Sequence, residues 1–134
     1  VTTHGYINKS GQLLTPDTTT IPPSTTNGIN DAPAIWDQLV RKYENIVMIV
    51  SGHDPCENIV SRQARGEHGN TVTQILIDPQ GVDKASGATG MVAMFYFSED
   101  GSKLRVEYYS TIQESYFGYS NQFELELDVV KPSL

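Results

Sequence analysis

The stretch from Ile46 to His53, IVMIVSGH, constrains the fold of this chain more than any other segment. Its first five residues are apolar and mostly β-branched, which is typical of a parallel strand buried on both faces. Residues 31–45, DAPAIWDQLVRKYEN, come just before it and predict an amphipathic helix, with Asp31 as the N-cap and Pro33 in the first turn. The chain opens with VTTHGY, the end of an earlier strand. These segments together predict a βαβ unit with two parallel strands.

Each of these two strands ends beside a histidine, at His4–Gly5 and at Gly52–His53. The carboxyl ends of parallel strands meet at one edge of a sheet, where open α/β sheets place their ligands. Imidazole is a preferred ligand for zinc and iron, so His4 and His53 are candidate metal ligands. Two ligands do not define a metal site, and on spacing alone two ordinary loop histidines bonded to backbone carbonyls are favoured. Carboxylates that could complete a metal site are scarce nearby in the sequence, and the two closest are Asp54 and Glu57. The third histidine, His68, is interpreted as a turn residue rather than a ligand.

The second half of the chain predicts four strands, over residues 71–78, 90–97, 102–110 and 122–130. The turn sequence SEDG at 98–101 predicts an antiparallel hairpin, and the uncharged run Met91–Phe97 is expected to be a central strand. The predicted fold class is therefore α/β, a βαβ unit passing into a mostly antiparallel sheet. Residues 7–30, rich in Thr and Pro, predict a long loop, either a binding lid or a surface insertion.

Length and charge exclude several classes of protein. With 134 residues the chain is long enough for one domain, 1–134, with a substantial core. Its net charge of −7 and the lack of any basic run argue against general binding of nucleic acid or of an anionic membrane. No apolar run approaches the ~20 residues of a membrane span. The single cysteine, Cys56, excludes a disulfide framework.

Cys56 and Arg62 stand in C-x5-R spacing, which superficially matches the phosphate loop of cysteine phosphatases. Such a loop must turn its backbone N–H groups inward around a dianion. Here the intervening residues contain no glycine, and Glu57 would repel a phosphate. The match is interpreted as accidental, with Cys56 an inert and partly buried residue.

The order of several motifs resembles the C-terminal part of bacterial calcineurin-like metallophosphoesterases, a Ser/Thr-phosphatase-like family. These motifs are VTTHGY, the Trp-bearing helix, IVMIVSGHD, GEHGNTVTQILIDPQG and GMVAMFYFSEDGSKLRVEYYS, and they cover nearly the whole chain. The family builds a two-metal centre from five motifs, of which the last two are an isolated histidine after a strand and Gly-His-x-His. By resemblance, His4 is the isolated histidine and Gly52–His53 begins the final motif.

The resemblance implies a hydrolase that cleaves phosphate esters with a metal-activated hydroxide, using two divalent ions of Mn, Fe or Zn, and it implies phosphate-ester substrates. The implied fold is half of a four-layer α/β/β/α sandwich, with this chain supplying one sheet and its flanking helix. Relatives of this type are often exported, which is the only indication of localisation.

The sequence departs from the family pattern in two ways. The second histidine of the final motif is replaced by Pro55, so Asp54 or water would have to substitute as a ligand. The first three motifs, with the bridging aspartate, are absent. This absence, together with a first residue that is not Met, predicts a C-terminal fragment of a longer phosphoesterase that is inactive alone and dimerises through exposed sheet edges or an apolar face. The alternative is a non-catalytic module that binds a ligand or partner.

Overall fold

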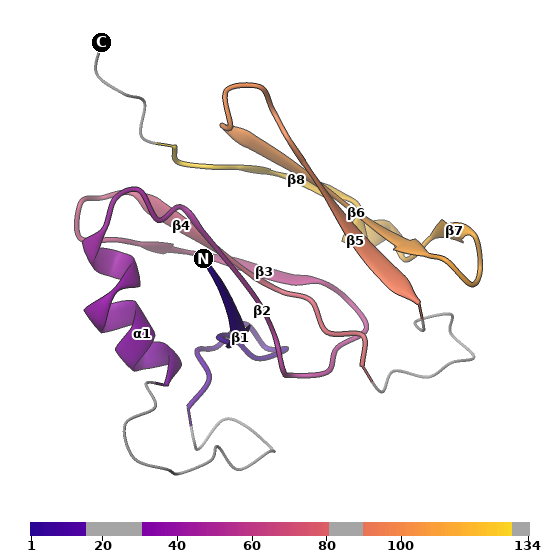
Figure 1. Ribbon diagram of the computed structural model, residues 1–134, viewed down its shortest axis with the longest axis horizontal. Helices are drawn as coiled ribbons and strands as arrows, with labels where there is room; N and C mark the ends of the chain where they lie inside the picture. Colours follow the sequence, from indigo (N-terminus) through magenta and orange to yellow (C-terminus); the bar gives the residue numbers. More distant parts are fainter. Residues whose placement is uncertain (16–30, 81–89, 130–134) are drawn as a thin grey trace.

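The computed structural model describes residues 1–15, 31–80 and 90–129 of the chain (Figure 1). These residues form two four-stranded sheets, one short α-helix and two 3-10 helices. The elements in chain order are β1 (Thr2–Gly5), α1 (Ala32–Gln38), η1 (Val40–Lys42), β2 (Met48–Gly52), β3 (Val60–Arg65), β4 (Thr71–Leu76), β5 (Met91–Phe97), β6 (Lys103–Ser110), β7 (Ser115–Tyr116), η3 (Tyr119–Asn121) and β8 (Phe123–Glu126).

The first sheet has the strand order β1-β2-β4-β3. Strand β2 is parallel to both of its neighbours, whereas β3 is antiparallel to β4. The predicted βαβ unit is confirmed, because β1 and β2 pair in parallel with Thr2 opposite Val50 and with α1 between them in the chain. The run of apolar residues before Gly52 therefore occupies an interior strand, and Ile49 at its centre is fully buried.

The second sheet is antiparallel and has β6 at its centre, paired with β5 on one side and with β7 and β8 on the other. The hairpin between β5 and β6 is confirmed, and Gly101 N–H donates to Ser98 C=O across its turn at 2.9 Å. The expectation that Met91–Phe97 is central is wrong, because β5 pairs with β6 alone among the described strands. Two of its outer-face residues, Val92 and Tyr96, are exposed rather than buried.

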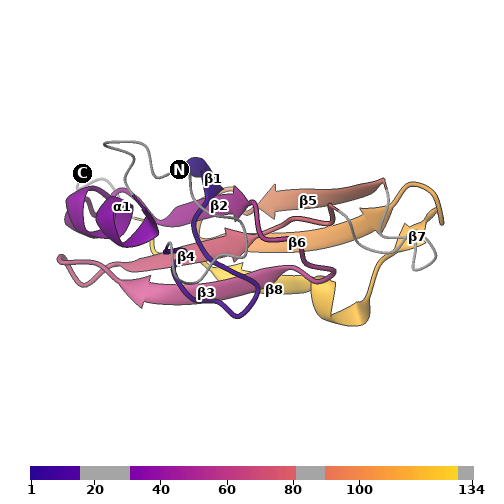
Figure 2. The same ribbon diagram turned by 90° about the horizontal axis from the view of Figure 1, so that it is seen from below.

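The described residues form three layers, with α1 on one sheet and the second sheet on its other face. One buried cluster joins α1 and η1 to the first sheet and contains Ala32, Val40, Ile49 and Val72. Another lies between the two sheets and contains Ile75, Leu104, Val106 and Leu127. Strands of both sheets run roughly along the longest axis of the molecule (Figure 2). The chain is thus mixed α/β, mostly strand with little helix, and it supplies two sheets where one was expected.

The helix is shorter than the predicted span of 31–45. Its N-terminus is as predicted, since the Asp31 carboxylate accepts from Ala34 N–H at 2.9 Å. It ends at Gln38, and a 3-10 turn follows in which Lys42 N–H donates to Leu39 C=O at 3.2 Å. Arg41 C=O accepts from Glu67 N–H in the β3–β4 turn at 2.7 Å. No helix of the described segments is long and apolar enough to cross a bilayer.

Candidate functional site

The structure brings together the two histidines singled out in the sequence. His4 lies within β1, one residue before its end, and His53 directly follows β2. Because β1 and β2 are adjacent and parallel, their ends meet at one edge of the sheet. His4 Nε2 lies 2.7 Å from His53 Nδ1, although the residues are 49 positions apart. The rings meet edge to face with centroids 4.6 Å apart, and both side chains reach the surface.

His53 occupies an unusual backbone position. Its φ is 76°, in the left-handed region that favours glycine, and an L side chain there costs roughly 1–2 kcal/mol. Such strain is often retained where a side chain must point in a particular direction. Space for the ring comes from Gly5 on the neighbouring strand, where a Cβ atom would lie 3.2 Å from His53 Cβ. The strand end is shaped to accommodate this imidazole.

A pair of substitutions separates this backbone strain from the role of the ring. We expect His53→Gly to be more stable than His53→Ala by about 1 kcal/mol, because both remove the imidazole but only alanine keeps a Cβ at positive φ. Urea denaturation of the two variants measures the difference. At Asp54, where φ is not positive, the same pair should show the opposite order. Equal stabilities at position 53 would show that its backbone is not strained.

Asp54, the suggested substitute ligand, has a structural contact. One of its carboxylate oxygens accepts from Lys9 N–H at 2.7 Å and so fixes the turn that follows β1. A ligand role for Asp54 stays a prediction, and Pro55 beside it is exposed and carries no donor atom.

Sequence reasoning missed a second carboxylate at this edge, that of Asp78. It comes two residues after β4, which is parallel to β2 on the side opposite β1. Asp78 Oδ2 lies 3.7 Å from the position a Cβ on Gly52 would occupy, and Asp78 C=O accepts from Cys56 N–H at 2.7 Å. The signal was present, because TVTQILID ends in aspartate, but its parallel pairing with β2 was not predicted.

The two imidazoles suit a shared metal ion in type and position. At metal–nitrogen distances of about 2.1 Å, two nitrogens on one ion lie roughly 3.0–3.4 Å apart. The observed 2.7 Å is that of a hydrogen bond, so the rings would separate by a few tenths of an ångström and lose the shared proton. Within residues 1–15, 31–80 and 90–129, no cluster of three or more His, Cys, Asp or Glu side chains could hold an ion. The pair therefore fits as part of a ligand set.

The remaining sequence candidates lie apart from this pair. His68 is confirmed as a turn residue, in the β3–β4 connection, with Nε2 3.1 Å from Lys42 C=O. Cys56 is buried, and burial raises the pKa of its thiol, which opposes formation of the nucleophilic thiolate. Arg62 lies in β3 and donates to Gly11 C=O at 2.8 Å. Because strand β3 begins at Val60, residues 57–61 do not form a phosphate loop, and the spacing is accidental.

Comparisons of the chain with protein-family models, with curated proteins and with solved structures found no match.

Proposed function

We propose that this chain is the C-terminal part of a metal-dependent phosphoesterase of the calcineurin-like kind, in which His4 and His53 bind a divalent ion. The observation that carries the proposal is the 2.7 Å approach of two imidazoles from sequentially distant strand ends, at the edge where α/β sheets bind ligands. The packing of α1 on the first sheet supports it, since a sheet with a flanking helix is the half of the four-layer sandwich that the proposal requires.

In this proposal, the residues of this chain hold the metal ion and orient the imidazoles that bind it. The strained backbone at His53 and the missing side chain at Gly5 set the direction of the second imidazole against the first. A divalent ion bound there, of Mn, Fe or Zn, would stabilise negative charge on a phosphate ester and make water a better nucleophile near neutral pH. Asp54 is the proposed replacement for the ligand that Pro55 cannot supply.

The proposal includes inactivity of the isolated chain. Metal ions of this kind take four to six ligands, and the imidazole pair supplies two. The first three motifs of the family would have to contribute the rest. The relevant active form is the N-terminally extended protein, defined as this chain preceded by those motifs.

The test measures metal binding and hydrolysis in both forms. We expect the isolated chain to bind Zn²⁺ weakly through its two imidazoles, seen as shifts of the His4 and His53 ring signals in NMR spectra, and to leave an aryl phosphate intact. The extended protein should bind Mn²⁺ or Zn²⁺ stoichiometrically and hydrolyse the ester. An extended protein that binds no metal and is inert would contradict the proposal.

The second candidate is a non-catalytic module that binds a ligand or partner. The observation that favours it is the hydrogen bond itself, because two neutral imidazoles at 2.7 Å satisfy each other without an ion. In that case, Zn²⁺ would leave the two ring signals unmoved in both forms.

A further inference from the structure

Strand β5 leaves one backbone edge without a partner among the described strands, since it pairs with β6 alone. Two hydrogen bonds show which residues face β6: Ser98 N–H donates to Lys103 C=O at 3.0 Å, and Thr111 N–H donates to Gly90 C=O at 3.1 Å. In an antiparallel pair such bonded positions recur every two residues. The even-numbered residues from 90 to 98 therefore bond to β6, and the N–H and C=O groups of residues 91, 93, 95 and 97 point away from the sheet.

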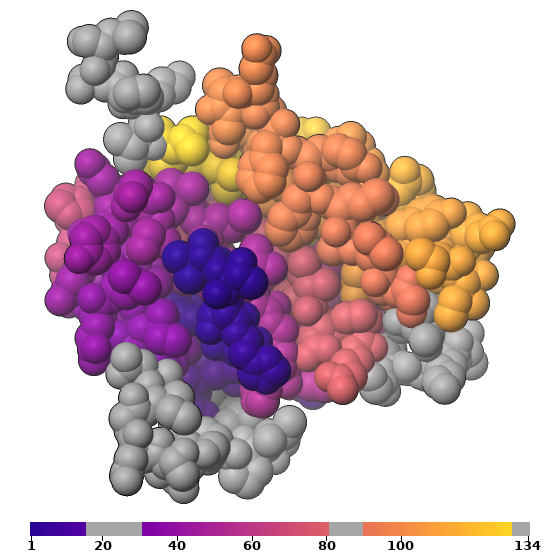
Figure 3. Space-filling view, in the orientation of Figure 1, coloured from indigo at the N-terminus to yellow at the C-terminus, as the bar shows by residue number. Residues whose placement is uncertain are grey.

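This edge also lacks the usual protection against pairing. Natural proteins protect edge strands with charged residues, short length or a cover. Strand β3 carries Arg62 and Arg65, strand β8 carries Glu124 and Glu126, and β1 is four residues long. Strand β5 has the sequence MVAMFYF, seven residues with no charge and no proline. In Figure 3 it lies at the front of the molecule, with no other described segment across it.

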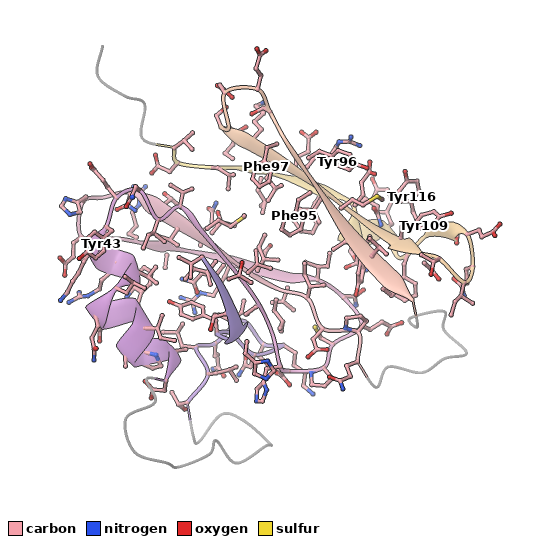
Figure 4. All side chains as sticks on the ribbon, viewed as in Figure 1. Tyr43, Phe95, Tyr96, Phe97, Tyr109 and Tyr116 are labelled. Carbon is pink, nitrogen blue, oxygen red and sulfur yellow. The ribbon has the colours of Figure 1, made fainter. Side chains whose placement is uncertain are left out.

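Side chains on both faces of β5 are apolar and partly open to solvent. Phe97 is 54% exposed, Val92 45% and Tyr96 41%. Phe95 lies on the side of the first sheet and packs in the core between the sheets, whereas Tyr96 lies on the outer face under the Arg105 guanidinium (Figure 4). A neighbouring strand would cover these groups and bond to the free backbone in one step.

We propose that β5 pairs antiparallel with β5 of a second copy of this chain, around a two-fold axis at Met94. This is the register that pairs the whole strand, because Met94 is its midpoint. It places Met91 opposite Phe97 and Ala93 opposite Phe95 on the inner face, and Val92 opposite Tyr96 on the outer face. All these pairs are uncharged, and the outward backbone groups at 91, 93, 95 and 97 bond to each other. The strand is complementary to itself, which favours a second copy over an unrelated strand.

The register predicts a specific cross-link. At the axis the two Met94 residues form a non-hydrogen-bonded pair, with Cα atoms about 4.5 Å apart, which a disulfide can bridge. In a Cys56→Ser background, Met94→Cys should form a disulfide-linked dimer under mild oxidation. Val92→Cys on the same face should not, because its copies lie four residues out of register, roughly 13 Å apart. Equal cross-linking at both positions, or none at position 94, would overturn the proposal.

A charge at the axis provides an independent measurement. Met94→Lys places a lysine opposite Glu107 within the monomer, where it is tolerated, but places two lysines face to face in the dimer. Sedimentation equilibrium should show self-association weakened at least ~10-fold. The matched control is Tyr119→Lys, at a 97% exposed aromatic residue outside β5, which should leave it unchanged. A chain that stays monomeric at millimolar concentration, or a dimer insensitive to Met94→Lys, would exclude this pairing.

Discussion

In the N-terminally extended protein, His4→Ala and His53→Ala are each expected to lower kcat/KM for an aryl phosphate by about 10²-fold or more. Substitution of groups that only support metal ligands already costs 10–100-fold, and a ligand itself should cost at least as much. If both imidazoles bind one ion, the first substitution already disables it. The kcat/KM of the double variant should therefore lie within a few-fold of that of the less active single variant.

His68→Ala is the matched control for this experiment. His68 is an exposed histidine in the β3–β4 turn, and its nearest polar contact is a backbone carbonyl of η1. It should leave kcat/KM within about two-fold of the unsubstituted protein, since a surface substitution away from the site has little effect. Multiplicative losses at His4 and His53 would mean that the two rings act independently and do not share an ion.

Asn121→Ala is expected to lower the free energy of unfolding by about 2 kcal/mol. Asn121 is fully buried, and its side chain links three segments. Its Oδ1 accepts from Ile59 N–H at 2.8 Å, and its Nδ2 donates to Asn58 Oδ1 at 3.0 Å and to Phe117 C=O at 3.2 Å. Alanine would leave the Ile59 N–H unpaired, at about 1–3 kcal/mol, whereas Phe117 C=O would keep a second donor, Gln122 Nε2 at 3.1 Å. Urea denaturation measures the loss.

Asn58→Ala serves as the control for this network. Asn58 is exposed, and its side chain accepts from Asn121 Nδ2 at 3.0 Å. Water can replace it, so the expected cost is below about 1 kcal/mol. If the two alanine variants were equally stable, the buried amide would not be what joins the segment before β3 to η3.

Sequence reasoning predicted the parts of the fold that depend on strong local patterns. The run ending at Val50 indicated an interior strand, and the helix between two strand ends fixed their parallel pairing. Parallel pairing then placed His4 and His53 at one edge, and the structure brings them into contact. The last predicted strand, over residues 122–130, is present as β8, Phe123–Glu126.

The parts that were missed depend on neighbours that a single sequence does not identify. A run that is apolar on both faces, such as Met91–Phe97, fits a central strand and an edge strand equally well. The strand pairing decides between them, because β8 pairs with β6 and so makes β6, not β5, the central strand. Strand β3 was not predicted as an element because Ser61, Arg62 and Gln63 carry a weak pattern, and its pairing with β4 defines it. Asp78 was overlooked for the same reason, since its place beside Gly52 follows from the β2–β4 pairing.

The parallel pairing of β1 with β2 also bears on how the chain acquires its structure over time. During synthesis β1 emerges first, yet Thr2 finds its partner Val50 only after the helix and β2 have been made. Contacts so distant in sequence close large loops and slow folding. The meeting of His4 and His53 should thus be a late event, so that their ring signals, followed after dilution from denaturant, would report the final docking of the first strand.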